Sequence, residues 1–328
     1  PIIGFLAEYD ALPEIGHACG HNLLGTAVCA AACALKADYE SSGEPIVIRV
    51  YGCPAEEIMS GKIIMDEQNV FDDLSIAVTW HPFDRNRVSN DIWQAQDIKN
   101  YTFHELMNIG VNYLREHVTD DVRMHYAYMD NGIPANVVPD FAKTNYFIRS
   151  TKRSRTEDAS KRVDACAKGA AMMTGTTVDI ELVGSCMEMK VNRPLVEVYY
   201  EAMTHIPTPE YTDAELDFAK DISEKAGLMN NGKYFAGLYP LEDTPVPLSI
   251  GTDASQVSHT VPLITISAAT MCHGTALHHW AAREQAGMSI GHKGMLYAAR
   301  CMAEGTKLLL SKPEYLQAVW DYHNIPQD

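Results

Sequence analysis

The sequence predicts an α/β fold in which a mixed, largely parallel sheet carries helices on both faces and is interrupted by a smaller inserted unit. Four apolar runs are continuous rather than alternating, as is typical of parallel strands covered on both faces. They are Ile2–Ala7, Ile46–Tyr51, Ile76–Trp80 and Leu263–Ala268. Helical segments lie between and after these runs, among them the alanine-rich Asn22–Ala37 and the closing helix Gly294–Leu310. This succession of strands and helices is the α/β pattern.

The middle of the chain has a different order of elements. We expect strands and helices at Ile98–His104, Glu105–Val118, Arg123–Tyr128, Phe141–Arg149, Glu157–Met173 and Thr176–Val183. Their order, strand-helix-strand-strand-helix-strand, is the ferredoxin-like βαββαβ unit. The sequence therefore predicts one domain from residues 1–92 and 193–328 and a second, inserted domain from residues 93–192.

The composition limits the partners of the chain. Apolar residues make up 46% and charged residues 21% of the 328 residues, as in ordinary soluble proteins. The net charge of −17 argues against nucleic acid or an anionic membrane surface as a partner. No run of apolar residues is long enough to span a membrane. The eight scattered cysteines favour a reducing compartment, so we expect a cytoplasmic protein.

The chain starts at Pro1 directly on an apolar run. A chain seldom begins inside its own core strand, so we expect that an N-terminal stretch precedes it, and a signal peptide is one form that such a stretch takes.

Side chains that bind metals follow each of the four expected core strands. In chain order they are Glu8 and Asp10 with His17, Cys19 and His21, then Glu56 and Glu57, then His81, and finally His273 with His278 and His279. In open α/β sheets, ligands bind outside the carboxyl ends of the strands. Cys, His and Glu delivered at four strand ends therefore predict a metal site.

Each of these motifs has a plainer explanation when it is taken alone. A Cys-Gly-His triplet is usually loop chemistry, and a Glu-Glu pair is usually solvated surface. A histidine after a strand is more often a hydrogen-bonded structural residue than a ligand. Coincidence at four strand ends is improbable, however, so the constellation favours the metal site.

The residue types fit a hydrolase. Imidazole and carboxylate suit Zn or Mn, and a thiolate favours Zn. Two ions about 3.5–4 Å apart lower the pKa of a shared water toward ~7. Of the adjacent Glu56 and Glu57, one can bind metal while the other takes the proton of the attacking water and passes it to the leaving amine.

The chain resembles the p-aminobenzoyl-glutamate hydrolase branch of the aminoacylase/carboxypeptidase metallopeptidase family. The resemblance is carried by the strings GFLAEYDALPEIGHACGHNLLGTA, VYGCPAEE followed by SGK, FDDLSIAVTWHP, NVVPD, IRS, TDASQVSHTVP and ALHHW followed by IGHKGML. It extends from Gly4 to the helix after Gly294. It implies two divalent ions, Mn or Zn, and hydrolysis of an amide that joins an acyl or aroyl group to an amino acid such as glutamate.

The resemblance also implies roles for individual residues. It implies metal ligands at Cys19, His21, Glu57, His81 and His278, and a general base at Glu56. Cys19 takes the place that a bridging Asp holds in other branches. His279 is adjacent to His278, and only the Leu-His alignment favours His278. Asp10 resembles an acid that orients a ligand.

The inserted domain, residues 93–192, resembles the lid of the family, which also carries the dimer contact, and residues 1–92 and 193–328 resemble its catalytic domain. We therefore expect a homodimer. Asn136 and Arg149 match residues that grip the carboxylate of the substrate, a task that suits the planar fork of Arg. Without the resemblance, Asn136 would be interpreted as a turn residue near Pro139 and Arg149 as part of a surface ion pair.

The chain departs from the family pattern in the lid. Family lids carry a Gly-x-Ala-His-type loop whose His reaches into the active site of the partner, whereas this chain runs from His104 straight into Glu105. A strand and the helix packed on it need a connector of about 2–6 residues. We therefore expect residues to be missing there, with the Cα atoms of His104 and Glu105 well beyond the ~3.8 Å of a bonded pair.

Three other functions stay open. A dipeptidase of the same family is the first, and a catalytically silent ligand-binding relative, which the absent loop would explain, is the second. The third is a cysteine hydrolase that uses Cys19 with His17 or His21, which would leave Glu56 and Glu57 idle.

Overall fold

The structure is a computed structural model, and it describes residues 1–102, 105–130 and 141–326 of the chain. Among these, the central sheet has the strand order β2-β1-β3-β11-β4. Its strands are β1 (Ile2–Glu8), β2 (Val47–Cys53), β3 (Ile76–Phe83), β4 (Arg87–Val88) and β11 (Leu263–Ala269). The first four strands in the sheet order are parallel, and only β4 is antiparallel. The mixed α/β fold predicted from the sequence is confirmed.

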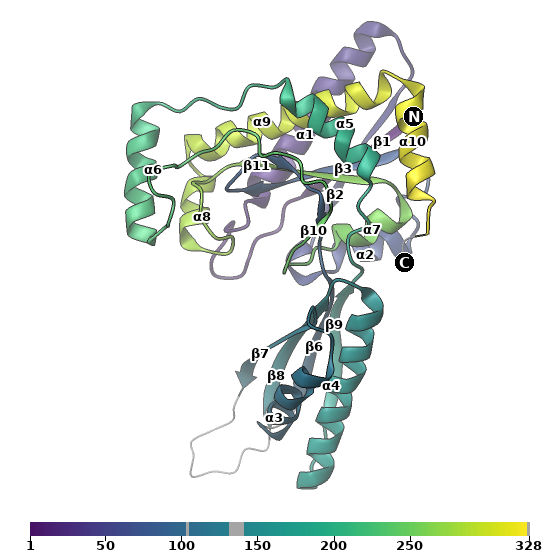
Figure 1. Ribbon diagram of the computed structural model, residues 1–328, viewed down its shortest axis with the longest axis vertical. Coiled ribbons are helices and arrows are strands. Elements are labelled where there is room, and N and C mark those ends of the chain that lie inside the picture. The colour runs from purple at the N-terminus through teal and green to yellow at the C-terminus, as the bar shows by residue number, and fades with distance from the viewer. Residues whose placement is uncertain (103–104, 131–140, 327–328) are drawn as a thin grey trace.

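The central sheet has helices on both faces (Figure 1). Phe5 and Val78 point to one face, where they join a core with α1 (His21–Ser42), α5 (Arg193–Thr204) and α9 (Ser289–Leu310). The alternate residues, Leu6 and Ala77, point to the other face, which α2 (Gly61–Glu67) and α7 (Ala254–Thr260) cover. This period of two follows from the pleat of a strand.

The expectation that all four core strands are covered on both faces is wrong for β2. This strand lies at the edge of the sheet, and Val47 and Val50 are 47% and 44% exposed. Its sequence is apolar, but a β-branched run does not distinguish an edge strand from a central one.

The structure has further helices that the sequence analysis did not name. They include α6 (Asp213–Ala226), α8 (Trp280–Ala286) and α10 (Pro313–His323), with 3-10 turns at Glu56–Ile58 and Arg115–His117. Helix α10 follows α9, so the helix expected to close the chain is not the last one. Helix α6 begins with a capping box, in which the Thr212 side chain and Glu215 satisfy each other's backbone N–H groups.

A second sheet forms a separate layer with two helices, and we call residues 95–186 the four-stranded unit (Figure 1). Its elements are β6 (Ala95–Thr102), α3 (Glu105–Leu114), β7 (Arg123–Asp130), β8 (Lys143–Ser150), α4 (Arg153–Thr174) and β9 (Asp179–Cys186). The strands are antiparallel in the order β7-β8-β6-β9. Tyr101, Tyr146 and Val163 lie in its own core, separate from the cores of the central sheet.

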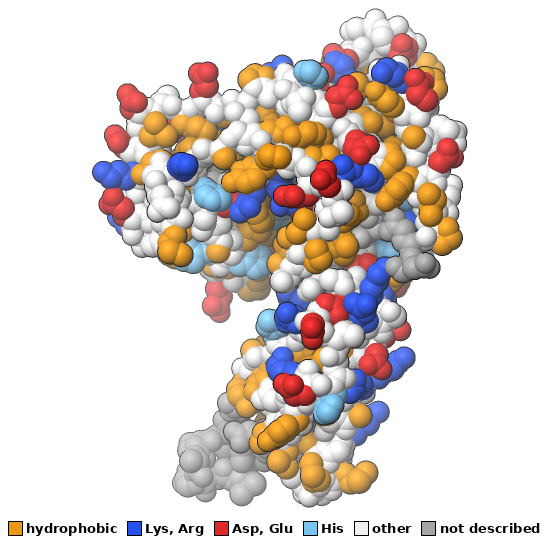
Figure 2. Space-filling view, viewed as in Figure 1, with side chains coloured by type: hydrophobic (Ala, Val, Ile, Leu, Met, Phe, Trp, Pro, Cys, Tyr) orange, Lys and Arg blue, Asp and Glu red, His pale blue; other side chains and the backbone are white. Residues whose placement is uncertain are grey.

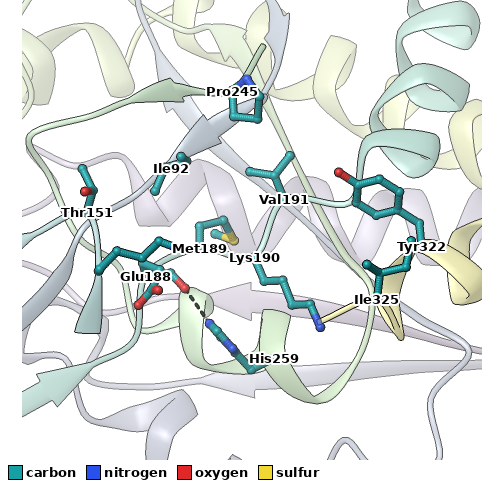
Figure 3. Close-up of a pocket in the computed structure, with 11 residues that line it drawn as sticks. Ile92, Thr151, Glu188, Met189, Lys190, Val191, Pro245, His259, Tyr322 and Ile325 are labelled. Carbon is teal, nitrogen blue, oxygen red and sulfur yellow. Dashed lines mark hydrogen bonds between the residues drawn. The ribbon is translucent and has the colours of Figure 1, made fainter. Parts of the chain in front are cut away.

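The two parts meet at a narrow junction (Figure 2). There β5 (Asp91–Ile92) pairs with β10 (Val246–Pro247), and the backbone N–H of Met189 donates to the carbonyl of Trp93. A cavity of about 340 Å³ lies at this junction, where the ring of His259 is hydrogen bonded to the carbonyl of Glu188 (Figure 3). None of the described residues predicted for the active site lines this cavity.

Two expectations from the sequence fall outside the described residues. Asn136 is one, and the spacing between His104 and Glu105 is the other, because His104 is not described. Among the helices that are described, none has both the length and the apolar character needed to cross a membrane. On the face in Figure 2, acidic and basic side chains are interspersed over both parts.

Candidate active site

The candidate site lies at the edge of the sheet where the parallel strands end. Glu8 is the last residue of β1, and Glu56 follows the end of β2. His81 lies near the end of β3, and His278 follows β11. Because these four strands run in the same direction, their carboxyl ends bring together residues that are far apart in the sequence.

A tight turn places the first pair of candidate ligands. Gly20 has a φ of 80°, and a Cβ there would lie 2.9 Å from the Cβ of Pro82. Only glycine fits this left-handed, close-packed position. The turn brings Cys19 and His21, the first residue of α1, against the end of β3 that carries His81.

Left-handed backbone also occurs at non-glycine residues around the site. Ala55 and Met59, with φ of 58° and 53°, flank the turn that carries Glu56 and Glu57, and His278 has a φ of 60°. Such conformations cost free energy and persist where the surrounding structure imposes them. Their position beside the candidate ligands indicates a functional constraint.

Two groups of potential metal ligands share one sulfur. Cys19, His21 and His81 offer ligand atoms within 4.8 Å of one another, and so do Cys19, Glu57 and His278. The Sγ atom of Cys19 lies 3.4 Å from Nε2 of His81, and Nε2 of His278 lies 3.3 Å from Oε2 of Glu57. This arrangement can hold two cations with the thiolate between them.

Hydrogen bonds to atoms that are not ligand atoms hold the candidate ligands in position. One carboxylate oxygen of Asp10 accepts from Nδ1 of His21 at 2.9 Å, and the other accepts from the backbone N–H of Glu57 at 3.0 Å. Nδ1 of His81 donates to the carbonyl of Pro82 at 2.7 Å. With Nδ1 used in this way, the Nε2 atom of each ring is the one that faces the cluster.

Buried negative charge dominates the electrostatics of the site. Burial and the neighbouring Glu57 raise the pKa of the Cys19 thiol well above its usual range, and burial raises the pKa of Glu57. Burial and Glu8 raise the pKa of Glu56 to about 8. Burial opposes the charge on His21, but Asp10 and the nearby carboxylates outweigh it and raise the pKa to about 9.

Three buried polar atoms of the site have no hydrogen-bond partner among the described residues, namely Oε2 of Glu8, Nε2 of His21 and Oε1 of Glu57. Unpaired buried atoms of this kind are costly unless an ion or water satisfies them. Together with the crowded acidic groups, they fit bound divalent cations, which would both fill these positions and compensate the charge.

The two adjacent histidines of the late motif have different surroundings. Nδ1 of His279 accepts from the backbone N–H of Ala281 at 3.3 Å and so caps α8. His278 instead contacts Glu57, with 52% of its side chain exposed. Of the two, the structure brings His278 to the cluster.

A cavity of about 730 Å³ opens beside the cluster. Its wall contains the acids Glu56 and Glu57 and the aromatic rings of Phe83, Trp93 and Phe147, together with Cys19, His81 and His278. Phe147 lies on β8 of the four-stranded unit, whereas the acids belong to the other part of the molecule. The cavity is therefore formed by both parts.

Arg149 lies on β8 and lines the same cavity. One terminal nitrogen donates to the carbonyl of Ser249 at 3.0 Å, and the guanidinium lies 5.1 Å from the centre of the Phe147 ring. Its Nε atom is buried and has no partner in the described ranges of the chain, and burial lowers the pKa of the group. An anion in the cavity would satisfy this donor.

Sequence reasoning missed a buried lysine behind the cluster. Lys62 is fully buried and forms ion pairs with Glu8, at 2.9 Å, and with Asp253. Oε2 of Glu8 lies 3.3 Å from Nε2 of His21, so the pair adjoins the candidate ligands. The sequence did contain signals for these residues, since Lys62 and Asp253 lie in the SGK and TDASQ strings and Glu8 ends the first strand. These strings do not show, however, that the three side chains are buried together.

The cysteine hydrolase alternative finds no support in the surroundings of Cys19. A nucleophilic cysteine needs a lowered pKa, as near cationic groups or a helix N-terminus. Here burial, Glu57 and Glu56 raise the pKa of the thiol.

Comparison with known proteins gives close relatives, although no family model matches the chain. One polypeptide of the p-aminobenzoyl-glutamate hydrolase of Escherichia coli (strain K12) is 35% identical over 390 residues, covering 100% of this chain and 81% of the relative. This alignment is longer than the 328-residue chain, so the relative has segments without a counterpart here. The Xaa-Arg dipeptidase of Mus musculus is 31% identical over 202 residues, covering 55% of this chain and 46% of the relative.

Solved structures share the fold. A dinuclear metal-binding peptidase of the M20 family from Bacillus subtilis matches 95% of this chain and 82% of its own, with a TM-score of 0.60 and 15% identity. An aminobenzoyl-glutamate utilization protein from Klebsiella pneumoniae matches 95% of this chain and 72% of its own, with a TM-score of 0.59 and 16% identity. These structures show the shared fold, and the relative that is 35% identical over the whole of this chain shows that the chain belongs to the p-aminobenzoyl-glutamate hydrolase branch of the aminoacylase/carboxypeptidase metallopeptidase family.

Proposed function

We propose that this chain hydrolyses the amide bond of N-acyl or N-aroyl amino acids, a class that includes p-aminobenzoyl-glutamate. The observation that carries the proposal is the pair of ligand groups that share Cys19 at the wall of a cavity of about 730 Å³. The cavity is large enough for a small acyl-amino acid and has both aromatic and charged walls.

The metal ions in this proposal are held by Cys19, His21 and His81 on one side and by Cys19, Glu57 and His278 on the other. Divalent ions at this position supply Lewis-acid polarisation of the scissile carbonyl and of the attacking water. The ligand types suit Zn or Mn, and the thiolate favours Zn. Asp10 orients His21 through its hydrogen bond.

Glu56 is the general base of the proposed mechanism. Its carboxylate is buried, lines the cavity and lies 4.0 Å from Nε2 of His21, with which it and Glu8 form a third group of potential metal ligands that lacks Cys19. In the proposed mechanism the metals are held by the two groups that contain Cys19, and Glu56 takes the proton of the attacking water and delivers it to the leaving amine. Its neighbour Glu57 is turned toward His278.

Arg149 binds the carboxylate of the amino-acid portion, together with Asn136. The unpaired Nε atom of Arg149 and its place on the cavity wall support this role. A planar guanidinium binds a carboxylate through two parallel hydrogen bonds, which both attracts and orients the substrate.

Residues 93–192 are proposed to be a ferredoxin-like lid and dimerisation domain, inserted into a catalytic domain of residues 1–92 and 193–328. The strand order of the four-stranded unit supports the ferredoxin-like fold. The dimerisation role is supported by an exposed apolar stripe on α3, formed by Leu106, Ile109 and Tyr113. A homodimer in light scattering is expected, and a monomer at high concentration would contradict the dimer.

The eight cysteines are all free, which supports the proposal of a cytoplasmic location.

The decisive test combines metal analysis with activity. The purified chain is assayed against N-aroyl-glutamates, N-acyl amino acids and dipeptides, with and without chelator. We expect about two equivalents of metal and chelator-sensitive hydrolysis of the N-acyl or N-aroyl substrates. Preference for dipeptides would favour the dipeptidase alternative, which the mammalian relative's name supports for a part of the chain. Metal binding without hydrolysis of any substrate would favour a silent relative.

A further inference from the structure

Arg85 is a second guanidinium on the wall of the active-site cavity. It follows β3 and His81 in the string HPFDR, and no sequence motif predicted a role for it. Arg149 reaches the same cavity from the four-stranded unit. The cavity thus has two arginines, supplied by different parts of the molecule.

The position of Arg85 is fixed by its neighbours. Its Nε donates to Oδ1 of Asp84 at 2.7 Å, and one terminal nitrogen donates to Oδ2 at 3.2 Å. The guanidinium carbon lies 5.6 Å from the ring centre of Phe83 and 5.3 Å from that of Tyr239. An arginine held by one carboxylate and two rings has already lost most of its side-chain freedom.

Asp84 is itself anchored. It is buried, and its Oδ2 atom accepts from the backbone N–H of Gly274 at 2.8 Å and lies 3.1 Å from Nδ1 of His273. The Asp84–Arg85 pair therefore cannot swing away from the cavity without breaking these contacts.

Asp84 does not use all of the N–H donors of the Arg85 guanidinium. A guanidinium has five N–H groups, and Asp84 uses only one edge. Within the part of the chain that the structure describes, the remaining N–H groups have no hydrogen-bond acceptor. The side chain is 30% exposed and lines the cavity, so a ligand there can reach these donors.

We propose that Arg85 binds a second carboxylate of the substrate and so selects N-acyl derivatives of dicarboxylic amino acids, such as glutamate and aspartate. The inference rests on the proposed function. One arginine suffices for a substrate with a single carboxylate, and Arg149 has a free donor for that purpose. A second preorganised fork on the same cavity wall suits a second carboxylate.

A simpler role for Arg85 is to stabilise Asp84 and, through it, the segment that leads to His278. The two roles differ in their dependence on the substrate. A structural role lowers activity on every substrate, whereas a specificity role lowers it only where the second carboxylate is present.

The test compares N-benzoyl-glutamate with N-benzoyl-glutamine, which share the first carboxylate and differ only at the side-chain carboxyl group. The parent enzyme should prefer the glutamate substrate by about 10- to 100-fold in kcat/KM. Arg85→Gln should remove most of this preference, mainly by raising KM for the glutamate substrate. It should leave the glutamine substrate within about twofold of the parent.

Two further variants complete the experiment. Arg85→Lys keeps the charge without the fork and should restore part of the preference. Arg283→Gln is the matched control, because Arg283 also pairs with its chain neighbour, Glu284, but does not line the cavity. It should behave like the parent.

The outcomes separate this inference from the proposed function. Hydrolysis of both substrates with no preference in the parent, or equal losses on both in Arg85→Gln, would overturn the role of Arg85 alone. Should Arg85→Gln not fold, the preference of the parent and the behaviour of Arg85→Lys decide the matter. A metal-loaded parent that hydrolyses neither substrate would overturn the proposed function and this inference with it.

Discussion

The backbone N–H of His278 donates a hydrogen bond to the carbonyl oxygen of Ala18 over 3.1 Å. This bond joins the two loops that carry Cys19 and His278, which come from opposite ends of the sequence. Because it involves only main-chain atoms, it does not depend on the side chains that it brings together. Substitutions of the candidate ligands should therefore alter metal binding and catalysis while leaving the loops in place.

Replacing Glu56 by Gln should abolish most activity without releasing metal. Gln keeps the size of the side chain but cannot accept the proton of the attacking water, so kcat should fall by ~10² or more. Metal content and kcat are measured on the same sample. Glu67→Gln, at an exposed position, is the control. Full activity of Glu56→Gln would remove Glu56 from the mechanism.

Removal of the metals should destabilise the protein as well as inactivate it. The buried acids and the thiol of the site then repel one another or take up protons, and ligands that bind only the folded state stabilise it by mass action. We expect a lower Tm in chelator, with recovery of Tm and activity when Zn or Mn is added back. An unchanged Tm in a sample shown to be metal-free would contradict this expectation.

Arg149→Ala should impair substrates that carry a free carboxylate. Loss of a charge-assisted fork should lower kcat/KM by about 10²-fold for such substrates. Analogues with an amidated carboxyl group should be poor substrates of the parent and little affected by the substitution. Arg162→Ala, on the outside of α4, serves as the control. Equal losses on both kinds of substrate would show that Arg149 acts structurally.

Lys62→Met should be strongly destabilising. The substitution leaves Glu8 and Asp253 buried without their counter-charge, and breaking a buried pair in this way costs about 3–5 kcal/mol. Denaturant unfolding measures the loss. Lys36→Met is the control, because the Lys36 side chain is 67% exposed. Equal stabilities of the two variants would show that the buried ion pairs contribute little.

His323 should make the protein less stable in mild acid. Burial, together with the nearby Lys190 and His259, lowers the pKa of His323 to about 4. The unfolded chain, with a His pKa of about 6.5, therefore binds a proton that the folded chain does not bind until the pH nears 4. Its contribution to stability is present above about pH 6.5 and is lost as the pH falls toward 4.

His323→Gln should accordingly reduce the slope of the unfolding free energy against pH between about pH 6.5 and 4. The reduction should be at most the slope that corresponds to one bound proton. Urea unfolding of parent and variant at several pH values measures this slope. His205→Gln, at an exposed position, should keep the slope of the parent. Identical slopes for the parent and His323→Gln would contradict the assignment.

Much of the fold was predictable because its signals are local. The four apolar runs became β1, β2, β3 and β11 with ends shifted by at most three residues. The edge position of β2 was not predictable, because exposure of Val47 and Val50 depends on which strand pairs beside them. Helix α10 was missed although Pro313 stands at its first position, where proline is a common signal for the start of a helix.

The candidate site was predictable where residue type and strand end coincide, as at His81. It was not predictable where burial decides the role. Lys and Arg are residue types that usually lie at the surface. Only tertiary packing shows that Lys62 is fully buried and that Arg85 lies between two aromatic rings. The choice between His278 and His279 also depends on a feature that the motif does not contain, the cap of α8.

The position of β11 in the central sheet has a consequence for synthesis of the protein on the ribosome. This strand pairs with β3 and β4, yet it comes from residues 263–269, near the end of the chain. The four-stranded unit, by contrast, draws its strands from residues 95–186 alone and has its own core. It can therefore fold before β11, the fourth parallel strand of the central sheet, has been synthesised. Arrest of translation before residue 263 should yield nascent chains in which the four-stranded unit resists proteolysis and the central sheet does not.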